Sequence, residues 1–239
     1  MFTKIAIIGT GNIGTWLLKI LQNQNNISVI SVSSRKIDIL PCDFDLYVFA
    51  LKDDVYEVVL KQISFTMPCA VHTSGSLSQN ILAPFAEKYG VIYPYQTILR
   101  NAVCGMRCAE IQVPVCVEAS GTIFENALLD WTQAIFNNVH KINEQQRFAM
   151  HLAAVFACNF TNAMYGIAYN IFKENKLDWS LMFPLLEQTL TNAKYNDPHL
   201  CQTGPAVRND ISIMKKHCKD LNNEDLRLLY KIVSKIIQQ

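Results

Sequence analysis

The sequence predicts an α/β fold in which a doubly wound, mainly parallel sheet is followed by an all-α C-terminal domain. Short apolar runs rich in Val, Ile and Phe alternate with helix-like segments over residues 1–143, as a parallel sheet covered on both faces requires. The first of these runs leads directly into a glycine-rich loop and a helix. Strand patterns then stop, and residues 144–239 carry only helical patterns.

The first strand and its loop form the most informative motif. Residues 4–8 are an apolar run, and glycines spaced as G-x-G-x-x-G separate it from the helix-like residues 15–21. This pattern allows a tight turn, close approach of a pyrophosphate to the backbone, and close packing of helix on strand. The helix N-terminus would face the phosphates; the alternative is a plain glycine turn. The residues predicted to bind a dinucleotide here are Gly9, Gly11, Asn12, Ile13 and Gly14.

The remaining elements of the first domain follow in alternation. The expected strands are residues 27–33, 45–51, 69–73, 91–93, 113–118 and 138–142. The expected helices between them are residues 55–62, 81–89 and 124–136. Because the strands are almost continuously apolar, they indicate a Rossmann dinucleotide-binding domain over residues 1–143.

The second predicted domain spans residues 144–239 and contains substrate-binding and dimerisation surfaces. Its expected helices are residues 144–172, 179–193, 207–221 and 224–237. Several of them are apolar on more than one face, which suggests burial against a partner. We expect a homodimer formed through this domain; the alternative is a compact monomer with a buried central helix.

Composition excludes several classes of partner. The net charge of +1 creates no long-range field for nucleic acid or an anionic membrane, and no apolar run is long enough to cross a membrane. The first residues lack the pattern of a secretory signal. None of the 8 cysteines forms C-x-x-C, and Cys104 and Cys108 lack a second pair with metal spacing. We therefore expect a cytoplasmic protein with reduced cysteines and no metal.

The end of the second strand indicates which nicotinamide cofactor is bound. Sites specific for NAD place an acidic residue there, on the ribose 2′-hydroxyl. This chain has Ser33, Ser34, Arg35 and Lys36 instead, and an Arg fork with neighbouring hydroxyls suits a 2′-phosphate. We therefore expect NADP, with NAD less favoured; the alternative is that Arg35 and Lys36 are solvated loop charges.

Two further strand ends are expected to reach the cofactor, because ligands of an open parallel sheet lie beyond the carboxyl ends of its strands. Leu51 and Lys52 follow the third strand and Ser74 follows the fourth. These residues are predicted to contact the cofactor. Asp53 and Asp54 precede a helix, and we expect at least one of them to cap it.

Polar residues in the first long helix of the second domain suggest a substrate cleft. His151 and Asn162 are eleven residues apart, so an α-helix places them on one face, with Asn159 at its edge. Buried polar side chains need partners. We predict that this stripe lines the cleft; the alternative is a set of core polar groups that satisfy one another.

Arg208 is the third candidate in this domain. Residues 203–210 are expected to open a helix, with Thr203 as its cap and Pro205 in its first turn. An arginine at a helix start opposes the helix dipole, which indicates a separate task such as binding a carboxylate or phosphate, with Asp210 orienting it. A local ion pair is the alternative.

These motifs together resemble the Rossmann-like proteins with a C-terminal helical domain of the DUF2520 type, a group labelled as NADP oxidoreductases. The residues that carry the resemblance are 9–14, 50–53, 72–75, 93–97, 151–159 and 203–210. More distantly, the layout is similar to pyrroline-5-carboxylate reductases and β-hydroxyacid dehydrogenases, in which a helical domain dimerises and closes the active site. The chain departs from the DUF2520 pattern at Lys52 and at Tyr93, where a histidine is more frequent. It also lacks the Lys-x-x-x-Asn pair of the β-hydroxyacid dehydrogenases, because residues 142–172 contain no lysine.

The resulting expectation is an NADPH-dependent reductase, or the reverse dehydrogenase, of a small carbonyl or imine substrate. The cofactor would supply the hydride. His151 would exchange the proton, Asn159 would polarise the substrate, and Arg208 would anchor an anionic group. The missing lysine leaves two alternatives open: a non-catalytic NADP-binding sensor or interaction protein, and a structural dimer with a vestigial nucleotide site.

Overall fold

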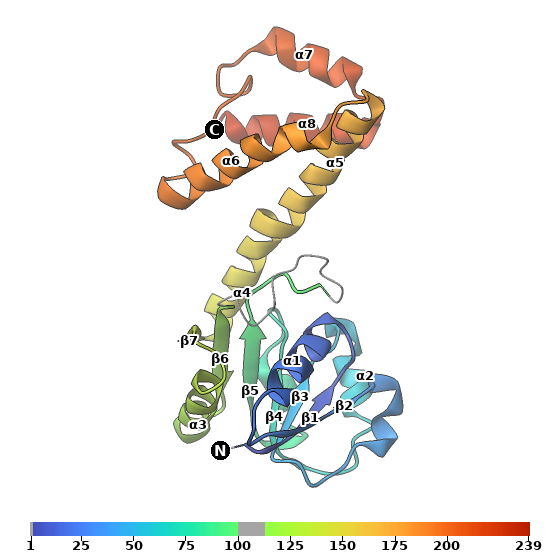
Figure 1. The fold of residues 1–239 in the computed structure, drawn as a ribbon, viewed down its shortest axis with the longest axis vertical. Helices are drawn as coiled ribbons and strands as arrows, with labels where there is room; N and C mark the ends of the chain where they lie inside the picture. The colour runs from blue at the N-terminus through green and yellow to red at the C-terminus, as the bar shows by residue number, and fades with distance from the viewer. Residues whose placement is uncertain (1, 100–112) are drawn as a thin grey trace. The chain divides into compact units, whose positions relative to one another are not determined.

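The computed structural model describes residues 2–99 and 113–239, so Cys104 and Cys108 lie outside the described residues. The chain forms two compact units, Met1–Ala163 and Met164–Gln239 (Figure 1). The first contains a seven-stranded sheet, and the second is entirely helical in structure. The predicted fold class is therefore confirmed, whereas the domain division between residues 143 and 144 stays a prediction.

The sheet is parallel apart from one strand pair. The strands are β1 (Lys4–Ile8), β2 (Ser28–Val32), β3 (Leu46–Phe49), β4 (Met67–His72), β5 (Ala86–Pro94), β6 (Val115–Ala119) and β7 (Val139–Lys141). Their order is β2-β1-β3-β4-β5-β6-β7, and β5 and β6 are antiparallel. The carboxyl ends of the first five strands therefore lie along one edge of the sheet.

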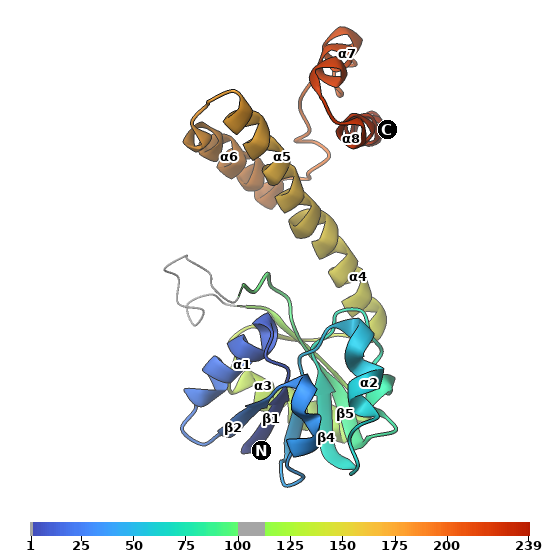
Figure 2. The same cartoon turned by 90° about the vertical axis from the view of Figure 1, so that its right-hand side faces the viewer.

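Helices cover both faces of the sheet. Those of the sheet region are α1 (Asn12–Gln22), α2 (Tyr56–Leu60) and α3 (Thr122–Gln133), with the 3₁₀ turns η1 (Ser34–Ile39), η2 (Asp53–Val55) and η3 (Gln79–Leu82). Ile5 and Ile7 of β1 pack with α1 and α3, whereas Ala6 and Ile8 pack with α2. Figure 2 shows α1 and α2 on opposite sides of the strands. The alternation of β1 between two buried layers is the reason that the strand is apolar throughout.

The predicted helix over residues 81–89 is wrong. Only η3 is helical there, and β5 begins at Ala86. The first residues of β5 have moderate helix preference. Ala86 nevertheless pairs with Met67, and Lys88 pairs with Cys69, in the parallel ladder. Tertiary pairing thus overrides local propensity.

The remaining helices follow β7. They are α4 (Glu144–Ala154), the π-helical segment η4 (Val155–Phe160), α5 (Thr161–Glu174), η5 (Trp179–Met182), α6 (Phe183–Tyr195), α7 (Ile211–Asp220) and α8 (Glu224–Ile237). α4 begins with a capping box, in which Asn143 and Gln146 satisfy each other's backbone N–H groups. Within residues 2–99 and 113–239, no helix has the length and apolar character needed to span a membrane.

The predicted helix start near residue 207 is also wrong. α7 begins at Ile211, and the preceding turn contains two left-handed residues, Gly204 (φ 106°) and Asn209 (φ 54°). These conformations interrupt a right-handed helix. Thr203 therefore caps no helix and Pro205 does not lie in a first turn.

The second unit exposes many large apolar side chains. The most exposed are Leu181, Leu185, Leu190, Tyr195, Leu200 and Ile236. Apolar exposure on this scale is typical of a surface that a partner covers. The homodimer stays a prediction, which the molar mass of the chain in solution would test.

Candidate functional site

The glycine loop has two glycines that the backbone requires and one that leaves space. Gly9 has a φ of 119°, and its N–H donates to the carbonyl of Val32 at 2.8 Å. A Cβ at Gly9 would collide with the carbonyl of Ala50, and one at Gly14 would collide with the carbonyl of Gly9. A Cβ at Gly11 would meet no atom of the described residues within 4 Å. The loop is therefore closely packed against the backbone at Gly9 and Gly14, whereas space remains beside Gly11.

The N-terminus of α1 has the features of an anion-binding site. Gly11 is its N-cap residue and supplies no side-chain cap, and the first turn contains no acidic residue. The unpaired N–H groups and the positive end of the helix dipole are thus not neutralised by side chains of the helix itself. Such a terminus is a standard phosphate site.

A cleft of about 440 Å³ brings the start of α1 together with two of the candidate catalytic residues, His151 and Asn159, within the first unit. Its walls come from the loops after β1, β3, β4 and β5 and from α4 and η4. The predicted site residues that line it are Asn12, Ile13, Leu51, Ser74, His151 and Asn159. Asp53, Gly75, Tyr93 and Tyr95 also line it.

His151 packs against the ends of two strands. Its Nδ1 lies 3.2 Å from Oη of Tyr93. A Cβ at Gly75 would lie only 2.7 Å from the same nitrogen and 2.9 Å from Cζ of Tyr93. The bare glycine after β4 therefore provides the space in which the imidazole and the phenol meet.

The π-helical segment changes which asparagine faces the cleft. An α-helix turns by about 100° per residue, which predicts that Asn162 shares a face with His151 and that Asn159 lies at the edge of this face. Residues of a π turn advance by less than those of an α-helix, because the hydrogen bonds span five residues. Val155–Phe160 has this form, so Asn159 rotates toward His151 and Asn162 rotates away. Asn159 lines the cleft and Asn162 does not.

The expected capping role of Asp53 or Asp54 is wrong. Neither η2 nor α2 has a side-chain cap, because Lys52 and Val55 occupy the cap positions. The carboxylate of Asp53 instead accepts a hydrogen bond from the hydroxyl of Ser76. This bond joins the ends of β3 and β4 at the cleft.

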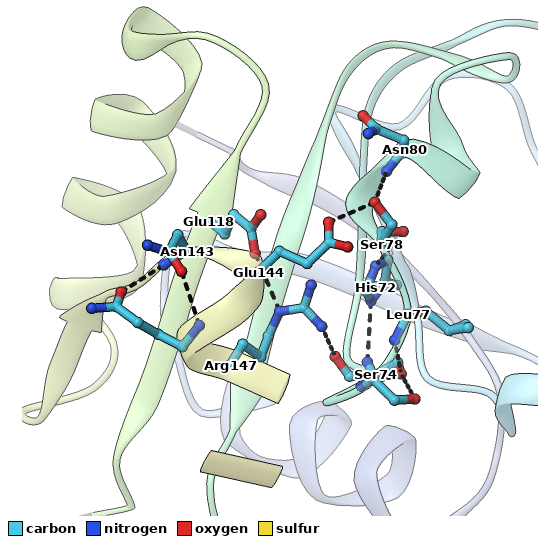
Figure 3. Close-up of polar contacts among 11 residues, drawn as sticks. His72, Ser74, Leu77, Ser78, Asn80, Glu118, Asn143, Glu144 and Arg147 are labelled. Carbon is cyan, nitrogen blue, oxygen red and sulfur yellow. Dashed lines mark hydrogen bonds and ion pairs between the residues drawn. The ribbon is translucent and has the colours of Figure 1, made fainter. Parts of the chain in front are cut away.

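A buried arginine that the sequence reasoning missed fixes the end of β4. Arg147, on the first turn of α4, is fully buried and donates from Nε to Glu118 on β6 at 3.2 Å and from Nη1 to the carbonyl of Ser74 at 3.0 Å. Figure 3 shows the guanidinium between these two partners. Burial raises the pKa of Glu118, and the charge of Arg147 opposes this rise. The available signal was Glu118 itself, a charge in an apolar strand, which requires a partner.

His72, at the end of β4, is held as a neutral ring. The N–H of Ser74 donates to its Nδ1 at 3.2 Å, and its Nε2 lies 3.3 Å from the carbonyl of Ser78. The ring can satisfy both contacts with a proton on Nε2 alone. Burial, and then the charge of Arg147, lower the pKa of His72 to about 4.

This shift predicts loss of stability in mild acid. The reference pKa of histidine is 6.5. Between about pH 6.5 and 4, His72 therefore binds a proton in the unfolded chain and stays neutral in the folded chain. The stabilisation is complete above pH 6.5, and we expect the free energy of unfolding to fall by about 3 kcal/mol as the pH drops to 4. Urea unfolding at several pH values measures this fall. His72→Gln should have a shallower pH dependence, and equal slopes in the two chains would contradict the assignment.

The residues after β2 lie next to the glycine loop, through the bond from Gly9 to Val32. The hydroxyl of Ser33 accepts from the backbone N–H of Arg35 and so begins η1. The Arg35 side chain is exposed. The cofactor contacts predicted for Ser33, Ser34, Arg35 and Lys52 stay predictions, since these four residues do not line the cleft.

Arg208 belongs to the second unit, in the turn before α7. Its side chain is exposed. Its expected role as an anion anchor stays a prediction.

Comparison with known proteins places these features in context. The DUF2520 model, described as a domain of unknown function, matches residues 113–237. A candidate NADP oxidoreductase from Bacteroides fragilis is 29% identical, with a TM-score of 0.88 over 99% of this chain and 98% of that one. No protein with a curated description matches the sequence.

Two more distant structures share the fold alone. A protein from Thermotoga maritima is 21% identical, with a TM-score of 0.68 over 98% of this chain and 96% of that one. A 1-pyrroline-5-carboxylate reductase from Streptococcus pyogenes is 18% identical, with a TM-score of 0.61 over 98% of each chain. The DUF2520 match over residues 113–237 confirms the resemblance inferred from the motifs.

Proposed function

The chain belongs to the DUF2520 family, whose model covers more than half of it, and from this premise we propose that it is an NADP-dependent oxidoreductase. It transfers a hydride to or from a small carbonyl or imine substrate. One observation carries the proposal: a single cleft is lined by Asn12 and Ile13 of the glycine loop and by His151 and Asn159. The candidate NADP oxidoreductase from Bacteroides fragilis supports the choice of reaction class.

The glycine loop fits a nicotinamide dinucleotide. The open space at Gly11 and the uncapped start of α1 suit a pyrophosphate. Leu51 and Ser74 line the neighbouring wall of the cleft, where they would contact the nicotinamide half. The cofactor supplies the hydride when bound.

The protein's own groups handle the proton and the substrate. His151 gives or takes the proton, because it lines the cleft and an imidazole is a common general acid or base. Asn159 polarises the substrate through its amide. For Arg208, in the second unit, the proposed role is to bind an anionic group, by its charge and planar geometry.

Arg35 is the residue proposed to select NADP over NAD. We expect Arg35→Ala to weaken NADPH binding about 10-fold to 100-fold, as for the loss of charge-assisted hydrogen bonds, and to leave NADH binding unchanged. Calorimetric titration of both nucleotides measures the two effects. Arg227→Ala, which removes an exposed arginine of α8, is the matched control. Equal losses for NADPH and NADH would contradict the assignment of the 2′-phosphate.

Turnover tests the reaction itself. The natural chain with NADPH is assayed against a panel of keto acids, aldehydes and cyclic imines by loss of nicotinamide absorbance. Oxidation of NADPH with one of these classes, abolished in His151→Ala, is the expected result. Tight NADPH binding without turnover across the panel would favour a non-catalytic NADP-binding protein instead.

A further inference from the structure

We propose that Tyr93 is a positioning residue that holds His151 in the tautomer with its proton on Nε2. This inference deepens the proposed function, on which it rests for its meaning, because it makes Nε2–H the donor that His151 presents to the substrate when a carbonyl or imine is reduced. The contact itself is a property of the folded chain and can be tested without a substrate.

The two rings are held together from three elements. Tyr93 is 8% exposed at the end of β5, and its Oη lies 3.2 Å from Nδ1 of His151 on α4. Their centroids are 6.2 Å apart at an angle of 71°. Gly75, after β4, closes the third side, because a Cβ there would lie within 3 Å of both side chains. The imidazole therefore meets the hydroxyl through Nδ1.

The direction of the hydrogen bond follows from the chemistry of the two groups. Nδ1 of His151 is the one hydrogen-bond partner of Oη among residues 2–99 and 113–239, and a phenol is the better donor of the two whereas an imidazole nitrogen is the better acceptor. Burial, with a smaller effect of Tyr95, raises the pKa of Tyr93 to about 12, so the phenol keeps its proton. Tyr93 thus donates to Nδ1.

The consequence for His151 is a fixed tautomer. A neutral imidazole that accepts at Nδ1 carries its proton on Nε2. No hydrogen bond to Nε2 is made by the described part of the chain. This nitrogen is therefore the one available to a substrate in the cleft.

NMR spectroscopy of the full-length chain tests the proposal. Long-range ¹⁵N–¹H spectra at about pH 8, with ¹⁵N-labelled histidine, distinguish the two tautomers, and His151→Gln assigns the signal among the 5 histidines. We expect the Nε2–H form to dominate. Tyr93→Phe should raise the ratio of Nδ1–H to Nε2–H about fivefold, as for the loss of one ordinary hydrogen bond.

Tyr95→Phe is the matched control, since it removes a hydroxyl from the same strand end. Its Oη donates to the carbonyl of Met150 at 3.1 Å and not to an imidazole, so the tautomer ratio of His151 should not change. A dominant Nδ1–H form in the natural chain, or an unchanged ratio in Tyr93→Phe, would overturn the proposal. Failure of every nicotinamide nucleotide to bind would overturn the proposed function and leave the tautomer result standing. Where turnover is measured, Tyr93→Phe should lower kcat and leave KM for the nucleotide unchanged.

Discussion

Gly11→Asp is expected to bind NADPH about 100-fold more weakly than the natural chain while its thermal unfolding midpoint stays the same. A Cβ at Gly11 meets no atom of residues 2–99 and 113–239 within 4 Å, so the substitution creates no collision with this part of the chain. The new carboxylate would lie at the uncapped start of α1. It would occupy the positive helix end and repel a pyrophosphate there, at a cost of about 3 kcal/mol in binding. Calorimetry and thermal unfolding measure the two quantities on one sample.

Gly14→Ala provides the contrast within the same loop. Its Cβ would collide with the carbonyl of Gly9, so this variant should lose stability as well as binding. Unchanged NADPH affinity in a folded Gly11→Asp variant would falsify the assignment of the loop to the pyrophosphate. Weak binding accompanied by a large fall in the unfolding midpoint would contradict the packing described for Gly11.

Arg147→Met is expected to lower the free energy of unfolding by about 3–5 kcal/mol, the range typical of a broken buried ion pair. Methionine fills similar volume but leaves Glu118 buried without its partner and the carbonyl of Ser74 without its donor. The guanidinium of Arg147 is buried in the first unit, between α4, β6 and the end of β4. Urea unfolding followed by circular dichroism measures the change.

The double variant Arg147→Met with Glu118→Gln separates the charge from the packing. It removes the isolated carboxylate, so a substantial part of the lost stability should return. Arg227→Met, on the exposed face of α8, should change stability by less than about 0.5 kcal/mol. A loss in Arg147→Met no larger than that of Arg227→Met would show that the buried pair does not stabilise the fold.

The sequence identifies those parts of the fold that depend on local patterns. The glycine spacing and the apolar strands each act within a few residues, and the corresponding elements form as expected. Residues 81–89 show where this reasoning fails. Their local preference allows a helix, whereas the backbone groups of Ala86 and Lys88 pair with β4, which is distant in the chain.

The candidate site was predicted in part for the same reason. Residues at strand ends and in the glycine loop could be named from topology, and the cleft contains Ile13, Leu51 and Ser74. The π turn at Val155–Phe160 depends on packing that no period reveals, so the helical wheel favoured Asn162. Arg147 looks like a solvated charge at a helix start until β6 brings Glu118 beside it.

The short connection between β7 and α4 has an evolutionary consequence. β7 ends at Lys141 and α4 begins at Glu144. His151, on α4, therefore lies in the same compact unit as the glycine loop. Descendants of such a chain can diversify or replace the helices beyond residue 163 and keep the cleft that contains His151. The two units are then free to evolve at different speeds.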